Sequence, residues 1–292
     1  MTSTLVRHRP HAASASSAQA CERARDWAEI QERMLVPLYE AVYERLEVGA
    51  GSRLLGLGCG SGLALLIAAG RGAAVSGTDT DRERLALARE RMSAHDSPAQ
   101  AARLFDGEAG AAADPGRPPY NLITVFQPIG CRAGDADGLG AALRSAVALA
   151  ERGSAVVLTG WGPPERCASS GVLRVAEGHS GRARTDGGTS HGRQAVGGGR
   201  WRPALRDDLE DVAARAGLRP DGSGRVACPF GYADVDSAVR GLLSTGLYDA
   251  AVRDSDQAQV EKEITEALHP HVRPDGTVWM PNVFRYLITR TP

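Results

Sequence analysis

A glycine-rich turn follows a short apolar run and marks a place where a ligand can approach the backbone. The run covers residues 54–57, and Gly-Cys-Gly-Ser-Gly follows at 58–62. Alternate glycines lack Cβ atoms, so a ligand can pack directly against such a turn. Residues 63–69 then favour a helix, whose N-terminus offers free N–H groups and the positive end of its dipole. The pattern predicts a strand–turn–helix ligand site, with Ser61 as the N-cap of the helix.

The spacing of the glycines separates two kinds of nucleotide site. A dinucleotide fingerprint has the form Gly-x-Gly-x-x-Gly. Started at Gly58, it demands a glycine where Leu63 stands, and started two residues earlier it demands one at Ser61. The chain instead has Gly58-x-Gly60-x-Gly62. This alternation does not fit the dinucleotide fingerprint.

An acidic residue ends the next predicted strand, residues 73–79. Asp79 stands seventeen residues after Gly62. At this point an acid can accept hydrogen bonds from both ribose hydroxyls of a nucleoside. Asp79 can instead cap the following helix, residues 82–92, and Asp81 is a second candidate for that cap. Both interpretations remain open from the sequence.

Further strands are expected at 101–107, 120–128 and 153–161. This order, together with the alternate glycines, resembles the class I S-adenosylmethionine-dependent methyltransferases over residues 50–161. The resemblance implies an α/β fold of Rossmann-like type, with a mostly parallel seven-stranded sheet flanked by helices. It also implies an antiparallel last strand at the end of the sheet, which the alternation of residues 284–288 fits.

The resemblance implies S-adenosyl-L-methionine as cofactor and S-adenosyl-L-homocysteine as product. Asp106 stands where the family places an acid that contacts adenine. The residues expected to bind the cofactor are Gly58, Cys59, Gly60, Gly62, Asp79, Thr80, Asp106, Gly107 and Phe126.

Two residues depart from the family pattern. The acid that normally stands two residues before the first glycine of the turn is Gly56, and the Asp of the fourth strand is Asn121. The family's acid helps to orient the cofactor, through water or its amino group. No histidine follows the fourth strand, so no general base is assigned. The departures leave three hypotheses open: methyl transfer to oxygen or carbon of a natural product, a methyltransferase-like cyclase, and a non-catalytic ligand-binding or regulatory protein.

The first part of the chain carries a helical pattern of apolar residues from 21 to 48, which Pro37 splits or kinks. In many small-molecule methyltransferases such a segment closes over the cleft, so we expect a helical lid here. The expected substrate-pocket residues are Trp27, Tyr39, Gln127 and Trp161. The alternatives are an aromatic stripe packed on the flank of the sheet and, for Gln127, a cap at the end of a strand.

The remaining organisation follows from composition. Residues 1–20 are rich in Ala, Ser, His and Arg and predict a disordered leader, and residues 49–292 form the methyltransferase-like domain. Within it, the glycine-rich stretch 171–199 predicts a flexible loop, because it has too little apolar surface to offset its ordering entropy. Residues 232–272 predict a helical insertion on the substrate side, before the last strand.

Composition also narrows the function classes. The formal net charge is −1 and hydrophobic residues make up 42%, so nothing favours nucleic acid as a partner. No apolar stretch reaches the length of a membrane span, and the first twenty residues lack the apolar core of a signal peptide. Five scattered cysteines indicate reduced thiols rather than a disulfide framework or a zinc site. We expect a cytoplasmic monomer or homodimer acting on a small molecule. Lys262 is the only lysine among 34 basic residues, which is typical of a GC-rich bacterial genome.

Overall fold

The computed structural model describes residues 11–94, 102–132, 134–177 and 201–292, and its main sheet has seven strands. The sheet order is β3-β2-β1-β4-β5-β9-β6. Neighbours from β3 to β5 pair in parallel, whereas β9 is antiparallel to both β5 and β6. The strands are β1 (Arg53–Leu57), β2 (Ala74–Asp79), β3 (Arg103–Asp106), β4 (Tyr120–Ile129), β5 (Ala150–Trp161), β6 (Arg219–Ala227) and β9 (Val283–Arg290). The predicted Rossmann-like sheet is confirmed.

The last strand lies inside the sheet, so the expectation that it ends the sheet is wrong. β9 separates β5 from β6, and β6 is the edge strand. Phe284, Leu287 and Ile288 of β9 are all buried. Because successive strand residues point to opposite faces, this run requires cover on both faces, which an interior position supplies.

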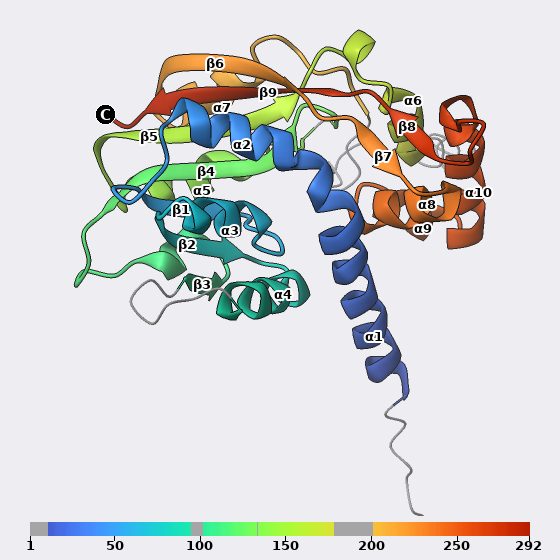
Figure 1. Cartoon of the computed structure of the whole chain (residues 1–292), viewed down its shortest axis with the longest axis horizontal. Helices are drawn as coiled ribbons and strands as arrows, with labels where there is room; N and C mark the ends of the chain where they lie inside the picture. Colours follow the sequence, from blue (N-terminus) through green and yellow to red (C-terminus); the bar gives the residue numbers. More distant parts are fainter. Residues whose placement is uncertain (1–10, 95–101, 133, 178–200) are drawn as a thin grey trace, which may run out of the picture.

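Helices cover both faces of the sheet in three layers (Figure 1). Leu54 packs into a core with the helices of one face, and its neighbour Leu55 packs into a second core on the other face. The helices of the first face are α2 (Val36–Arg45), α3 (Leu63–Gly70) and α4 (Arg82–Ser93). The second face is covered by η3 (Ala109–Ala112), α5 (Leu139–Val147) and α7 (Asp208–Arg215).

A smaller unit stands beyond the ends of the parallel strands, on the right of Figure 1. β8 precedes β9 by two residues but lies outside the main sheet, where it pairs with β7 in a separate two-stranded antiparallel sheet. The expected helical stretch 232–272 forms three helices and a short 3₁₀ turn between these two strands. The elements are η4 (Pro164–Arg166), α6 (Ser170–Leu173), η5 (Arg174–Glu177), β7 (Phe230–Tyr232), α8 (Val235–Ser244), α9 (Asp249–Asp254), α10 (Gln257–Leu268), η7 (His269–His271) and β8 (Val278–Met280).

Two segments expected to lack regular structure are helical where they are described. Residues 11–20, predicted as part of a leader, belong to α1 (His11–Asp26), and residues 1–10 lie outside the described ranges. Residues 171–177 of the predicted loop belong to α6 and η5, and residues 178–199 lie outside the described ranges. No helix in the described part of the chain is both long and apolar enough to cross a membrane.

The chain between α1 and α2 is helical but not α-helical. A π-helical turn, η1 (Trp27–Gln31), precedes a 3₁₀ turn, η2 (Glu32–Leu35). Gln31 and Glu32 are buried, with 5% and 2% of their surface exposed. They lie at helical spacing from the buried residues Ala28 and Leu35 and so share the inward face with them. The Trp27–Leu35 segment therefore presents polar as well as apolar side chains inward.

Candidate functional site

The turn after β1 needs its glycines. Gly58, Gly60 and Gly62 have φ angles of 61°, 57° and 78°, in the left-handed region that glycine enters without a Cβ clash. Gly62 is the N-cap of α3 and makes no side-chain cap, so the expectation that Ser61 caps this helix is wrong. The glycines therefore shape the turn at the carboxyl ends of the parallel strands, where open α/β sheets bind ligands.

The acid at the end of β2 reaches this turn. The Asp79 carboxylate accepts hydrogen bonds from the Gly60 amide at 2.7 Å and from the Asp81 amide at 2.8 Å. Asp81, not Asp79, caps α4, accepting from the amides of Glu83 and Arg84 at 3.1 Å each. Of the two interpretations left open by the sequence, the structure selects Asp81 as the cap and leaves Asp79 beside the turn.

A cleft of two adjoining cavities lies over the turn. The inner cavity, of about 190 Å³, and the outer cavity, of about 450 Å³, share the lining residues Leu57, Gly58, Asp79, Thr80 and Gln127. Together they fall within the volume of small-molecule sites, about 300–1,000 Å³. The cleft therefore has room for a ligand that extends to both sides of Asp79.

Most of the residues predicted for the site meet at this cleft. The inner cavity is lined by residues of the turn, of β4 and of the N-terminal helical region, and the outer cavity includes Gly107 after β3. The predicted residues on the inner cavity are Trp27, Tyr39, Gly58, Cys59, Gly60, Asp79, Thr80, Phe126 and Gln127.

Three predicted residues lie apart from the lining. A Cβ on Gly62 would meet the Ala88 Cβ at 3.0 Å, so this glycine allows α4 to pack closely. Asp106 forms an ion pair with the Arg82 Nε at 2.8 Å and lines neither cavity. Trp161 packs its ring 4.6 Å from that of Phe284 and lines neither cavity.

The two departures from the family pattern have different structural meanings. Asn121 lies at the amino end of β4, where its side chain accepts from the Arg53 amide at 2.8 Å and donates to the Gly51 carbonyl at 2.9 Å. It ties β4 to β1, at the end of the strands opposite the turn. Gly56 lines the inner cavity, and a Cβ there would lie 3.0 Å from Leu65 Cδ2. Only Gly56 bears on the cleft.

Glu32 is an acid of the cleft that the sequence did not reveal. Its carboxylate accepts a short hydrogen bond from the Ser61 hydroxyl and one from Arg91 at 3.0 Å, and it lines the inner cavity. Burial raises the pKa of Glu32, while Ser61, Arg91 and the Leu63 amide oppose that shift. Glu32 follows Ala28 by four residues and precedes Leu35 by three, and both are buried, so helical spacing places it on the inward face. The sequence does not reveal it as a site residue because its partners Ser61 and Arg91 lie far away in the chain.

Buried polar atoms without a hydrogen-bond partner gather at the cleft. Within the described ranges, three buried side-chain atoms have no hydrogen-bond partner, and all belong to lining residues: Trp27 Nε1, Arg84 Nε and Asp135 Oδ1. The Arg84 guanidinium stacks 4.2 Å from the centre of the Trp27 ring, and its Nε stands 3.2 Å from Asp81 without hydrogen-bond geometry. Buried polar groups normally find partners, so this concentration favours a ligand in the cleft.

Two side chains that resemble nucleophiles or bases remain protonated at neutral pH. Burial raises the pKa of the Cys59 thiol to about 12. It raises the pKa of the Tyr39 phenol well above the ordinary value of 10. Tyr39 packs its ring 4.7 Å from that of Phe126. These side chains can act as neutral contacts in the cleft, not as anionic groups.

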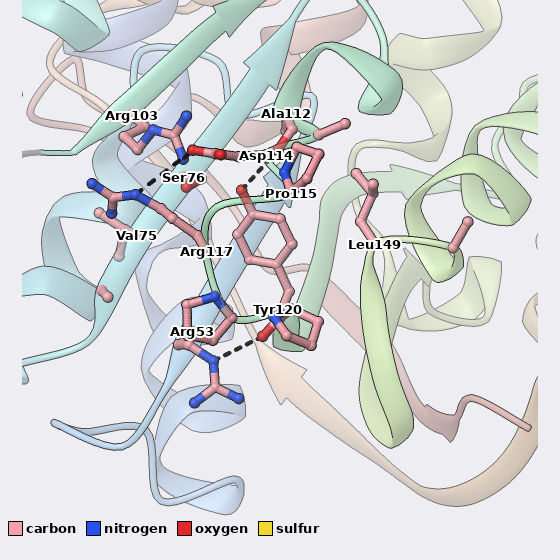
Figure 2. A pocket seen from close by; sticks show the side chains of 15 residues that line it. Arg53, Val75, Ser76, Arg103, Ala112, Asp114, Pro115, Arg117, Tyr120 and Leu149 are labelled. Carbon is pink, nitrogen blue, oxygen red and sulfur yellow. Dashed lines mark hydrogen bonds and ion pairs between the residues drawn. The ribbon is translucent and has the colours of Figure 1, made fainter.

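Figure 2 shows another cavity, of about 410 Å³, near the amino ends of the parallel strands. Arg103 and Arg117 both approach the Asp114 carboxylate, at 3.0 and 3.8 Å. Arg53 donates to the Pro119 carbonyl at 2.8 Å and pairs with Glu151. The arginines of this cavity are thus engaged with protein partners, in contrast to Trp27 Nε1 and Asp135 Oδ1 of the cleft.

Comparison with known proteins identifies the fold. No family model matches the sequence, and no curated protein matches it. Among solved structures, YjhP from E. coli superposes with a TM-score of 0.53 at 16% identity, covering 93% of this chain and 100% of its own. A SAM-dependent methyltransferase from Thiobacillus denitrificans, in complex with S-adenosyl-L-homocysteine, has a TM-score of 0.51 at 16% identity, covering 94% and 98%. The chain therefore has the fold of the class I S-adenosylmethionine-dependent methyltransferases.

Proposed function

We propose that the protein is a methyltransferase that binds S-adenosylmethionine in the cleft and methylates oxygen or carbon of a small natural product. The observation that carries this proposal is the Asp79 carboxylate held 2.7 Å from the Gly60 amide, between two cavities that contain unpaired polar atoms. An acid in this place can accept from both ribose hydroxyls while the ligand extends to either side of it.

The two cavities differ in one respect that gives the cofactor a direction. The outer cavity has apolar walls that suit a nucleobase, including Ala109, Ile129, Leu139 and Ala142, and the charged side chains that line it, Glu108, Asp135 and Asp137 among them, are all acids. The inner cavity carries both acids and a cation, the side chains of Glu32, Asp81 and Arg84, which suit the opposite charges of an amino-acid group. We place the base in the outer cavity, the ribose at Asp79 and Thr80, and the amino-acid end with its sulfonium in the inner cavity.

The bound cofactor would supply an electrophilic methyl group on sulfur. The chain's own contribution is to bind and orient, since in-line displacement gains much of its rate from positioning. Tyr39, Phe126 and Gln127 line the inner cavity from α2 and β4 and can orient an acceptor. Because Tyr39 and Cys59 are held protonated, an acceptor that must lose a proton requires a base other than these two.

Calorimetry with S-adenosylhomocysteine tests the cofactor proposal. Binding is expected, and its absence in the folded protein would refute the assignment. A second candidate, a methyltransferase-like cyclase, keeps its support only from Gly56, because Asn121 has a structural role remote from the cleft. The two are separated by incubating candidate acceptors with S-adenosylmethionine. A mass gain of one CH₂ unit indicates methyl transfer, whereas an isomer of unchanged mass indicates cyclisation.

A further inference from the structure

The Trp27–Leu35 segment brings a donor and an acceptor to the same residue of the turn. A Cβ on Gly60 would lie 3.1 Å from Glu32 Oε1 and 3.2 Å from Trp27 Nε1. Both side chains line the inner cavity. Glycine at position 60 thus allows a carboxylate and an indole N–H to stand together at the inner end of the cleft.

The two groups have different remaining capacity for hydrogen bonds. The indole N–H of Trp27 is buried and has no partner in the part of the chain that the structure describes. A carboxylate has about four acceptor sites, and Glu32 receives hydrogen bonds from Ser61 and Arg91 on one oxygen, Oε2, in addition to its interaction with the Leu63 amide. Its other oxygen, Oε1, is the one near Gly60. The segment therefore offers one unused donor and one acceptor with spare capacity.

No other acid of the inner cavity serves as well. The Asp79 carboxylate accepts from the Gly60 and Asp81 amides, and the Asp81 carboxylate caps α4. Gly56 contributes no side chain, and Leu65 Cδ2 would lie 3.0 Å from a Cβ placed there. A cation deep in the inner cavity would therefore meet Glu32.

We propose that Glu32 and Trp27 recognise the α-amino-acid end of the cofactor. The Glu32 carboxylate accepts from the ligand's ammonium, and the Trp27 indole N–H donates to its carboxylate. The inference rests on the proposed function. In this chain the acid that contacts the amino-acid end comes from the Trp27–Leu35 segment, whereas the family carries it on the first strand. Binding of the amino-acid end therefore requires that this segment is packed against the turn.

Three adenosine thioethers test the two contacts separately by calorimetry. S-adenosylhomocysteine carries both the ammonium and the carboxylate, its decarboxylated analogue carries only the ammonium, and methylthioadenosine carries neither. Glu32→Gln is expected to weaken the first two by about tenfold or more and to leave methylthioadenosine within about twofold. Trp27→Phe, which keeps an aromatic ring against Arg84, is expected to weaken S-adenosylhomocysteine alone by about tenfold.

Matched controls are available on the same chain. Glu29→Gln changes an exposed acid of the same π-helical turn, and Trp279→Phe changes an exposed indole of β8. Both should leave all three affinities unchanged. Melting curves establish that each variant is folded, and Trp27→Phe alone decides the matter if Glu32→Gln does not fold, because its effect should depend on the ligand's carboxylate.

The possible outcomes separate this inference from the proposed function. Equal weakening of all three ligands would show that the segment only supports the cleft, and unchanged affinities would show that neither side chain touches the ligand. Either result overturns the inference while the cofactor assignment stands. Equal affinity of the unaltered protein for methylthioadenosine and S-adenosylhomocysteine would likewise overturn the inference and leave the cofactor assignment standing. Failure of the unaltered protein to bind any of the three overturns both.

Discussion

The Asp79 carboxylate accepts a hydrogen bond from the Gly60 amide at 2.7 Å and so joins the end of β2 to the glycine-rich turn. The same carboxylate receives the Asp81 amide at 2.8 Å. These bonds fix the acid's position before a ligand arrives, and acceptor sites remain on both oxygens because each can accept more than one hydrogen bond. The geometry is thus prepared for two neighbouring hydroxyl groups.

Replacing Asp79 by Ala should reduce affinity for S-adenosylhomocysteine about tenfold to a hundredfold, since hydrogen bonds to a charged group contribute roughly 1.5–3 kcal/mol. Calorimetry measures the change. Asp234→Ala is the control, because Asp234 lines neither cavity and its carboxylate caps α8 by accepting from the Ser237 amide at 2.7 Å. A similar affinity in both variants would contradict the ribose assignment of Asp79.

Gly60→Ala should lower both the free energy of unfolding and cofactor affinity. The φ angle of 57° disfavours a Cβ by about 1–3 kcal/mol, and the new methyl group would press on Glu32 Oε1 and Trp27 Nε1. Gly51→Ala is the matched control, because a Cβ there meets nothing within 4 Å. Denaturant titration measures the free energy of unfolding, and calorimetry measures the affinity for S-adenosylhomocysteine. Intact binding by Gly60→Ala would show that the Trp27–Leu35 segment need not dock on the turn.

Gly56→Asp tests whether an acid on β1 can replace Glu32. The side chain must displace Leu65 Cδ2, which a Cβ would approach to 3.0 Å, so the free energy of unfolding should fall by about 1–3 kcal/mol. In a Glu32→Gln background, Gly56→Asp should recover part of the affinity for S-adenosylhomocysteine. Gly56→Asn has nearly the same size without the charge and should recover none. Equal recovery by both variants would exclude a charge effect.

Affinity for S-adenosylhomocysteine should depend on pH through Glu32. Burial raises the pKa of this carboxyl above its ordinary value of 4.5, and only the ionised form accepts from an ammonium. Affinity should therefore be full above the raised pKa and fall as the pH decreases through it. Arg91 and Ser61 face the carboxyl and oppose the shift, while Tyr39 beside it stays neutral. Calorimetry across pH should show that Glu32→Gln lacks this step, and identical profiles would contradict the assignment.

Much of the fold follows from local sequence patterns. The alternate glycines, the apolar runs and the acid that ends β2 lie within short stretches, where local spacing predicts the structure, and they predicted the turn and the position of Asp79 at the end of its strand. The position of β9 depends on the burial of both its faces by elements far away in the chain. The alternation of side chains at 284–288 indicates that this segment is a strand, but it does not indicate which strands lie beside it in the sheet. The division between β8 and β9 likewise depends on pairing with β7.

The site was less predictable than the fold, because its buried acid depends on partners far away in the chain. The spacing of apolar residues from 27 to 46 predicts a helical segment with a buried face, but it does not predict that an acid on this face belongs to the site. Glu32 is buried there, and the cost of burying a carboxylate is offset by Ser61 and Arg91 from elsewhere in the chain. Asp106 shows the reverse case. Its position in the sequence resembles a family contact, but in the structure its carboxylate pairs with Arg82.

The interior position of β9 sets an order for assembly during synthesis. Within the described ranges, β6 pairs in the sheet with β9 alone. The two strands are far apart in the sequence, because β9 begins 55 residues after Cys228, the residue that directly follows β6. As the ribosome delivers the chain from its amino end, β5 and β6 emerge with facing edges that must wait for a later strand. Unpaired strand edges are sites of aggregation. Deletions that remove residues 283–290 should therefore compromise solubility on expression far more than deletions of similar length in α1, and engineered fusions at the carboxyl end should leave these residues free to insert.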